Sequence, residues 1–228
     1  MIDTSGIRLF GDRSATDLFL QLADEHDMEL MGSQAEALEK MACGGRWCLA
    51  AVTAGDWFHD LTPWSAPAVF GKNSFGDGAA ETLMRLKGEA LAKITDRLET
   101  KESVRVYIAG YSLAGLFALW ASYQTDMFSG VAAASPSVWY PGWISYAEAA
   151  GRPLTSAVYL SLGDREEKTR NPAMAAVGDA IRRQKELLDA ANVDCALEWN
   201  RGNHFVDSHL RTARAMAWLL GRRKKTEA

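Results

Sequence analysis

The sequence predicts an α/β fold in which a mostly parallel central sheet is covered by helices on both faces. Short apolar or β-branched runs alternate with longer segments whose apolar residues recur every three or four positions. Strands separated by such helices pair in parallel, and a parallel sheet is buried on both faces. The chain has 228 residues, 48% of them hydrophobic and 24% charged, so we assign residues 1–228 to a single globular domain.

The predicted strands are short and rich in aliphatic or β-branched residues. They are Leu18 to Leu22, Trp47 to Val52, Val104 to Ala109, Val131 to Ala134, Val158 to Leu162 and Cys195 to Trp199. Because sites in parallel sheets lie beyond the carboxyl ends of the strands, the loops after these runs are where a functional site is expected.

Three helical segments follow from the same periodicity. Ala80 to Leu98 carries one apolar stripe on an otherwise charged surface. Asn171 followed by Pro172 is typical of a helix start, because Asn caps the first turn and Pro fits within it. Leu210 to Leu220 repeats the apolar spacing and predicts a last helix with one buried face.

Charge and apolar length exclude several classes of partner. The 25 Lys and Arg against 29 Asp and Glu give a net charge of −4, which does not favour nucleic acid. The longest apolar stretch, Leu113 to Ala121, is about half of a membrane-spanning helix, and the first residues do not resemble a secretory signal. We predict a cytoplasmic protein that contacts no membrane. The cysteines, Cys43, Cys48 and Cys195, have no metal-site or redox-pair spacing, and we expect free thiols and no metal.

The sequence from Gly110 to Gly115, GYSLAG, predicts the nucleophile of a hydrolytic site. It lies between the predicted strand Val104 to Ala109 and an apolar helical run, which is the setting of a strained turn that exposes a serine hydroxyl. Small residues at Gly110 and Ala114 are required because a sharp turn brings these two positions together. Ser112 is therefore the candidate nucleophile.

A serine nucleophile needs a base and an acid that orients the base, and these follow in the order acid then histidine. His204 comes after the predicted strand ending at Trp199 and is the candidate base, with His209 as the alternative. The loop after Leu162 contains three carboxylates, and the candidate acid is Glu166, with Asp164 and then Glu167 as alternatives.

Backbone N–H groups are expected to bind the oxyanion that forms when the serine attacks. The first is that of Leu113, directly after the nucleophile. The second is expected from the loop after the strand Trp47 to Val52, from either Trp57 or Asp56.

These motifs together resemble the putative-esterase family of α/β-hydrolases, which includes esterase D-like enzymes, feruloyl esterases and ferric-siderophore esterases. The resemblance is carried by the GYSLAG turn, the run from Ser135 to Tyr140 (SPSVWY), the Asp-Trp and Pro-Trp pairs at Trp57 and Trp64, and the Gly-Asn-His-Phe run around His204. It implies an α/β-hydrolase fold and a serine esterase that needs no cofactor. Because the chain is too short for a large lid over Ser112, we expect a compact fold without a lid domain. The family often places its acid three residues after the glycine that ends the strand, which is Glu166 here.

The leading hypothesis is an esterase that cleaves a carboxylic ester or thioester of a small soluble substrate through an acyl-enzyme on Ser112. The alternative is a binding protein that has kept the fold without the chemistry. Four tryptophans are expected in loops at the carboxyl ends of the strands, where they would form an aromatic wall for the substrate. They are Trp57, Trp64, Trp139 and Trp143.

Overall fold

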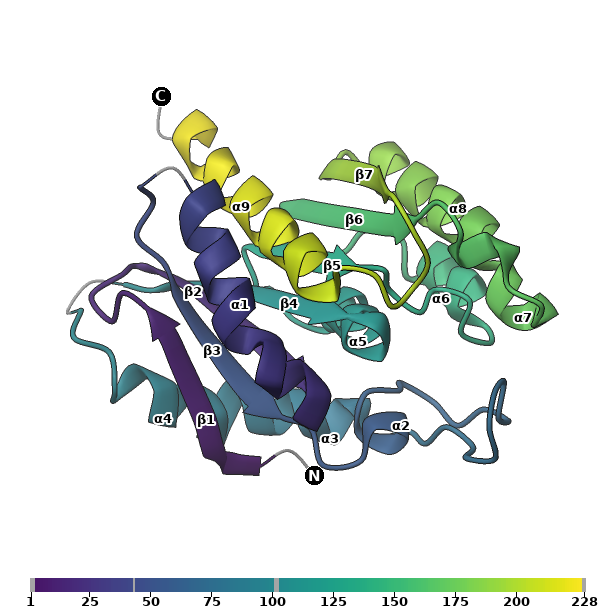
Figure 1. Cartoon of the computed structure of the whole chain (residues 1–228), viewed down its shortest axis with the longest axis horizontal. Helices are drawn as coiled ribbons and strands as arrows, with labels where there is room; N and C mark the ends of the chain where they lie inside the picture. The colour runs from purple at the N-terminus through teal and green to yellow at the C-terminus, as the bar shows by residue number, and fades with distance from the viewer. Residues whose placement is uncertain (1–2, 43, 101–102, 227–228) are drawn as a thin grey trace.

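The sheet predicted from the sequence is present in the computed structural model, which describes residues 3–42, 44–100 and 103–226. Seven strands form it in the order β1-β3-β2-β4-β5-β6-β7 (Figure 1). Strand β1 is antiparallel to β3, and every other neighbouring pair is parallel. The strands are β1 (Asp3–Gly11), β2 (Asp17–Ala23), β3 (Cys48–Thr53), β4 (Arg105–Tyr111), β5 (Gly130–Ala134), β6 (Ala157–Gly163) and β7 (Asp194–Asn200).

Helical segments connect the strands. They are α1 (Glu25–Met41), α2 (Trp57–Asp60), α3 (Ala79–Arg85), a π-helical turn η1 (Leu86–Ala90), α4 (Leu91–Thr95), α5 (Ser112–Gln124), α6 (Trp143–Ala150), a 3-10 turn η2 (Glu166–Lys168), α7 (Pro172–Ala175), α8 (Val177–Ala190) and α9 (Ser208–Thr226). The helix predicted over residues 80–98 corresponds to α3, η1 and α4. Asn171 caps α7 as expected, because its side chain accepts from the N–H groups of Ala173 and Met174. Within the described ranges, no helix is long and apolar enough to cross a membrane.

Helices cover both faces of the sheet, as predicted. Figure 1 shows α1 and α9 side by side across one face, where Met31 of α1 and Met216 of α9 are buried with Phe19 of β2. Leu18 and Leu20, the neighbours of Phe19 in β2, point to the opposite face and join the core formed with α3, α5 and α8. This alternation along one strand shows why a central parallel strand has an almost continuous apolar sequence.

Two elements of the first quarter of the chain were not expected from the sequence. Strand β1 is an edge strand with an irregular register between Asp3 and Arg8, and its sequence DTSGIRLFG has no continuous apolar run. Helix α1 has a mixed buried face that includes Gln34, whose amide hydrogen-bonds with Gln21 of β2. A polar pair in the core removes the apolar periodicity that would have revealed this helix.

Exposure varies among the predicted strands and the described cysteines. Trp199, the last residue of the predicted strand Cys195 to Trp199, is 39% exposed because β7 is the last strand of the sheet, and the guanidinium of Arg182 lies 4.8 Å from its ring centre. Cys48 is buried and Cys195 is partly buried, and both are free thiols. Cys43 lies outside the described residues.

Candidate functional site

Ser112 occupies the sharp turn between β4 and α5. Its φ of 57° lies in the left-handed region, where residues other than glycine are strained. The turn is possible because Gly110 has no Cβ: a Cβ there would overlap the backbone of Ala114. Gly115 is packed closely against Pro136 in the same way, where a Cβ would lie 3.1 Å from the Cα of Pro136. The local sequence therefore explains how the partly exposed hydroxyl is held at the carboxyl end of the sheet.

Three side chains from different loops form one chain of hydrogen bonds. Nε2 of His204 lies 3.0 Å from Oγ of Ser112, and Nδ1 of His204 lies 2.7 Å from Oε2 of Glu166. The three residues follow β4, β7 and β6, so the parallel sheet brings together positions that are 92 and 38 residues apart in the chain. His209, the alternative to His204, lies in the first turn of α9, and no hydrogen bond joins it to Ser112 among the described residues.

The three carboxylates of the loop after β6 have different partners. Asp164 accepts a hydrogen bond from the N–H of Gly202 at 2.9 Å and so stabilises the turn before His204. Glu167 forms an ion pair with Arg182 at 3.0 Å. Only Glu166 among the three is bonded to the imidazole, because the short turn η2 directs it inward while its neighbours face solvent or α8.

The second oxygen of Glu166 is held by donors on three sides. Oε1 accepts from the hydroxyl of Ser135 at 2.8 Å, the N–H of Gly163 at 2.7 Å and the guanidinium of Arg211 at 2.9 Å. Burial alone would raise the pKa of Glu166, but the hydrogen bond and charge of His204, the Gly163 N–H and the Ser135 hydroxyl outweigh it, and the pKa lies below its usual value. Glu166 is therefore a carboxylate at neutral pH.

The histidine loop and the serine turn are also held by direct contacts. The hydroxyl of Tyr111, next to Ser112, donates to the backbone carbonyl of His204 at 2.6 Å. Burial raises the pKa of Tyr111 to about 12, so this hydroxyl remains a donor. The N–H of Ser137 donates to the backbone carbonyl of Ser112 at 3.0 Å, and their hydroxyl oxygens lie 3.4 Å apart. These bonds limit how far Ser112 and His204 can move apart.

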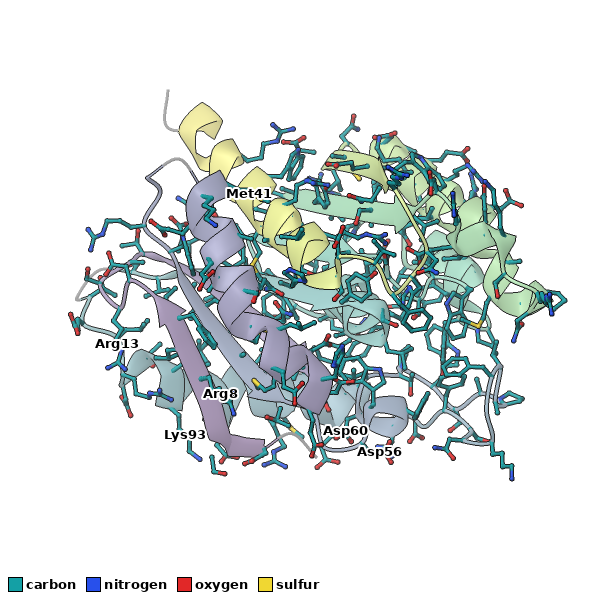
Figure 2. The ribbon with its side chains drawn as sticks, in the orientation of Figure 1. Arg8, Arg13, Met41, Asp56, Asp60 and Lys93 are labelled. Atoms are coloured by element: carbon teal, nitrogen blue, oxygen red, sulfur yellow. The ribbon has the colours of Figure 1, made fainter. Side chains whose placement is uncertain are left out.

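Two backbone N–H groups are candidates for binding an anion at Ser112. The N–H of Leu113 lies in the first turn of α5, where N–H groups have no partner within the helix. Asp56 and Asp60 lie together at α2 (Figure 2), and the N–H of Asp56 donates to Oδ2 of Asp60 at 3.0 Å. Because that N–H is occupied, the N–H of Trp57, the first residue of α2, is the remaining candidate of the two predicted from the sequence.

Comparison with known proteins assigns the family. Residues 51–207, more than half of the chain, match the family described as "Putative esterase". The chain belongs to this family. It is therefore a carboxylic ester hydrolase, as the sequence motifs suggested. A comparison with curated proteins found no match.

Solved structures similar to this esterase share its fold. One is an IroE-like serine hydrolase from Shewanella oneidensis, with a TM-score of 0.77 and 14% identity, covering 94% of this chain and 75% of that one. Another is the siderophore hydrolase EstB from Aspergillus nidulans, with a TM-score of 0.70 and 17% identity, covering 93% of this chain and 88% of that one. At these identities the similarity establishes the α/β-hydrolase fold.

The four tryptophans expected to form one wall of the esterase site are in different surroundings. Trp139 lines a cavity beside His204. Trp57 begins α2 and packs partly against the core, whereas Trp64 donates to the carbonyl of Pro141 and packs among tyrosines of the neighbouring loop and helix. The prediction for Trp143 is wrong: it lies in α6, not in a loop, and is 0% exposed, with its Nε1 bonded to Gln184.

Several residues that organise the esterase site were not identified from the sequence. Arg211 is a buried residue of helix α9 that lies next to the apolar stripe of that helix. An arginine beside a buried helix face could have indicated a buried acid as its partner, and this was the one signal for its role in the sequence. Ser135 has a φ of 42° and directs its hydroxyl to Glu166, a role that the SPS run does not reveal. Among the described residues, no group of three or more His, Cys, Asp or Glu side chains is arranged to hold a metal ion.

Proposed function

We propose that this esterase is a serine hydrolase that cleaves a carboxylic ester or thioester of a small soluble substrate through an acyl-enzyme on Ser112. The observation that carries the proposal is the continuous chain from Ser112 Oγ to His204 to Glu166, with heavy-atom distances of 3.0 and 2.7 Å. These distances are within the reach that proton transfer between a nucleophile and its base requires. They also argue against the alternative of a binding protein that has lost the chemistry.

Each residue has one role in the proposed reaction. Ser112 Oγ attacks the ester carbonyl while Nε2 of His204 takes the hydroxyl proton, and Glu166 stabilises the imidazolium that forms. The N–H groups of Leu113 and Trp57 bind the oxyanion, and the positive end of α5 adds to its stabilisation.

The intermediate then collapses in two stages. His204 returns its proton to the leaving alcohol, or to the thiol of a thioester, and the acyl group remains on Ser112. In the second stage His204 takes a proton from water, the resulting hydroxide attacks the acyl-enzyme, and Ser112 is released with its proton restored. The net reaction consumes one water and gives an acid and an alcohol, or an acid and a thiol from a thioester.

A fluorophosphonate probe tests the proposal because it reacts with activated serines. We expect stoichiometric labelling of the wild-type chain, no labelling of Ser112→Ala, and strongly reduced labelling of His204→Ala. Ser122→Ala is the matched control, because Ser122 is a buried serine in the same helix α5. Absence of labelling in folded wild-type protein would contradict the proposed mechanism.

A further inference from the structure

A cavity of about 400 Å³ lies beside His204 and Glu166, on the β5 and β6 side of the nucleophile. The residues that give it its chemical character come from the loop after β5, the turn after β6, the segment that leads into α8 and the histidine loop. They are Trp139, Arg165, Lys168, Met174, Val177 and Phe205. Because this cavity adjoins the proposed base, the part of a substrate that extends from the scissile ester can enter it.

The charge of this cavity is opposite in sign to that of the chain. Arg165 and Lys168 are exposed at its mouth, and the structure gives their side chains no ion pair within the described residues. Among the described residues that line the cavity, Glu166 is the only carboxylate, and its two oxygens are occupied by Arg211 and His204. The chain as a whole has a net charge of −4. Two cations beside a concave surface create a local positive potential that attracts an anion.

Within the described part of the chain, the neighbouring cation on α8, Arg182, is paired with carboxylates, unlike Arg165 and Lys168. Arg182 lies close in the fold but is neutralised, at 3.0 Å from Glu167 and 3.1 Å from Asp179. The acidic residues that could pair with Arg165 and Lys168 have other partners, since Asp164 accepts from Gly202 and Glu167 binds Arg182.

The rest of the lining is apolar and partly uncovered. Phe205 is 88% exposed although it follows His204 directly, and Trp139 also lines the cavity. Met174 and Val177 contribute aliphatic surface. A large aromatic side chain that remains in water next to a cavity gains apolar contact when a ligand covers it. The cavity therefore suits an apolar or aromatic body with an anionic group at its outer end.

We propose that this esterase prefers acidic esters, in which an apolar or aromatic body occupies the cavity and a free carboxylate or similar anion binds Arg165 and Lys168. The proposal rests on the proposed function, because the cavity is assigned to the substrate of the same site. It names these two cations as specificity-determining residues.

Two pairs of substrates test the preference, one for each side of the ester. The pair 4-acetoxybenzoate and its neutral methyl ester places the charge on the leaving group, and monophenyl glutarate and phenyl methyl glutarate place it on the acyl group. Phenol release is measured at pH 8, and kcat/KM is corrected for the rate of alkaline hydrolysis of each ester. We expect the anionic member of at least one pair to be preferred by roughly tenfold, as two screened ion pairs would give.

Charge variants show whether Arg165 and Lys168 cause the preference. In R165Q/K168Q the anionic-to-neutral ratio of kcat/KM is expected to fall by roughly tenfold, and in R165E/K168E it is expected to fall further. The matched control for R165E/K168E is K40E/K87E, which changes the net charge by the same amount as that variant at exposed positions at the end of α1 and in η1. Circular dichroism confirms that each variant is folded.

The possible outcomes separate this proposal from the proposed function. A ratio near one for both pairs, or a ratio that changes equally in K40E/K87E, overturns the anion preference. Fluorophosphonate labelling of wild-type Ser112 is measured in parallel, because that neutral probe does not depend on the cations. If the serine is labelled and the ratio is unaffected by R165Q/K168Q, only the anion preference fails; if the serine is not labelled, the proposed function fails.

Discussion

Arg211 and Glu166 form an ion pair of 2.9 Å in which the side chains are 2% and 5% exposed. The pair lies directly behind the imidazole of His204, since the other oxygen of Glu166 is bonded to that ring. Arg211 also donates to the backbone carbonyls of Arg201 and Asn203 in the histidine loop. One guanidinium therefore fixes both the carboxylate and the loop that holds the imidazole.

The first prediction concerns Arg211. Removing one partner leaves the other charge buried, so Arg211→Met is expected to lower the free energy of unfolding by about 3–5 kcal/mol and to reduce kcat. Arg211→Lys keeps the charge but cannot reach all the acceptors of the planar guanidinium, and we expect an intermediate effect. Urea denaturation and ester hydrolysis measure the two effects. Arg183→Met, on an exposed arginine paired with Glu148 and Glu186, is the control, and equal loss in both variants would refute the role of Arg211.

The second prediction separates the three carboxylates after β6. Glu166→Gln removes the negative charge opposite the imidazolium, and we expect kcat to fall by about 10³–10⁴-fold with little change in KM. The partners of Asp164 and Glu167 lie away from the imidazole. We therefore expect kcat of Asp164→Asn and of Glu167→Gln to remain within a few-fold of the wild-type value. Steady-state kinetics on a neutral ester measures all three. If the largest loss of kcat occurs in Asp164→Asn, the acid has been assigned to the wrong residue.

The third prediction uses the position of Trp57 at the start of α2. Proline is tolerated at the first position of a helix and has no N–H, and the extended backbone of Asp56 is compatible with a following proline. Trp57→Ala removes the side chain and keeps the N–H, whereas Trp57→Pro removes both. We expect kcat of Trp57→Pro to be about 10²–10³-fold below that of Trp57→Ala, the cost of one oxyanion donor. Equal kcat values in the two folded variants would assign the second donor elsewhere.

The sequence was sufficient for the parts of the fold and site that depend on local patterns. The strands β2 to β6 are apolar runs because both of their faces are buried, and the turn at Ser112 is recognisable because its glycines are required by contacts within a few residues. Edge strand β1 has no such run. Helix α1 was missed because Gln34 interrupts its buried face, although the polar group is satisfied by Gln21.

Long-range contacts explain what the sequence could not specify. Glu166 is distinguished from Asp164 and Glu167 only by the direction of a short 3-10 turn, and the family resemblance, not the spacing, favoured it. The partner Arg211 is 45 residues further along the chain, on a helix whose pattern predicted only a buried apolar face. Trp143 was placed at the site because it follows a strand, but α6 begins at this residue and turns its side chain into the core.

The fourth prediction concerns Asp27, a partly buried residue in the first turn of α1. Burial, with a smaller contribution from Asp24, raises the pKa of Asp27 from 3.8 to about 6. The folded state therefore binds this proton more tightly than the unfolded state, and between about pH 4 and 6 the contribution of Asp27 to stability becomes less favourable as pH rises. At pH 7.5 the carboxylate is ionised in both states, and the folded state carries the full cost of burying its charge.

We expect Asp27→Asn to raise the free energy of unfolding at pH 7.5 by about 1–3 kcal/mol. Near pH 4 the gain should largely disappear. Urea denaturation at both pH values measures this, with Asp126→Asn, on an exposed aspartate, as the control for loss of one charge. A gain in stability of the same size at both pH values would show that it does not arise from ionisation of Asp27.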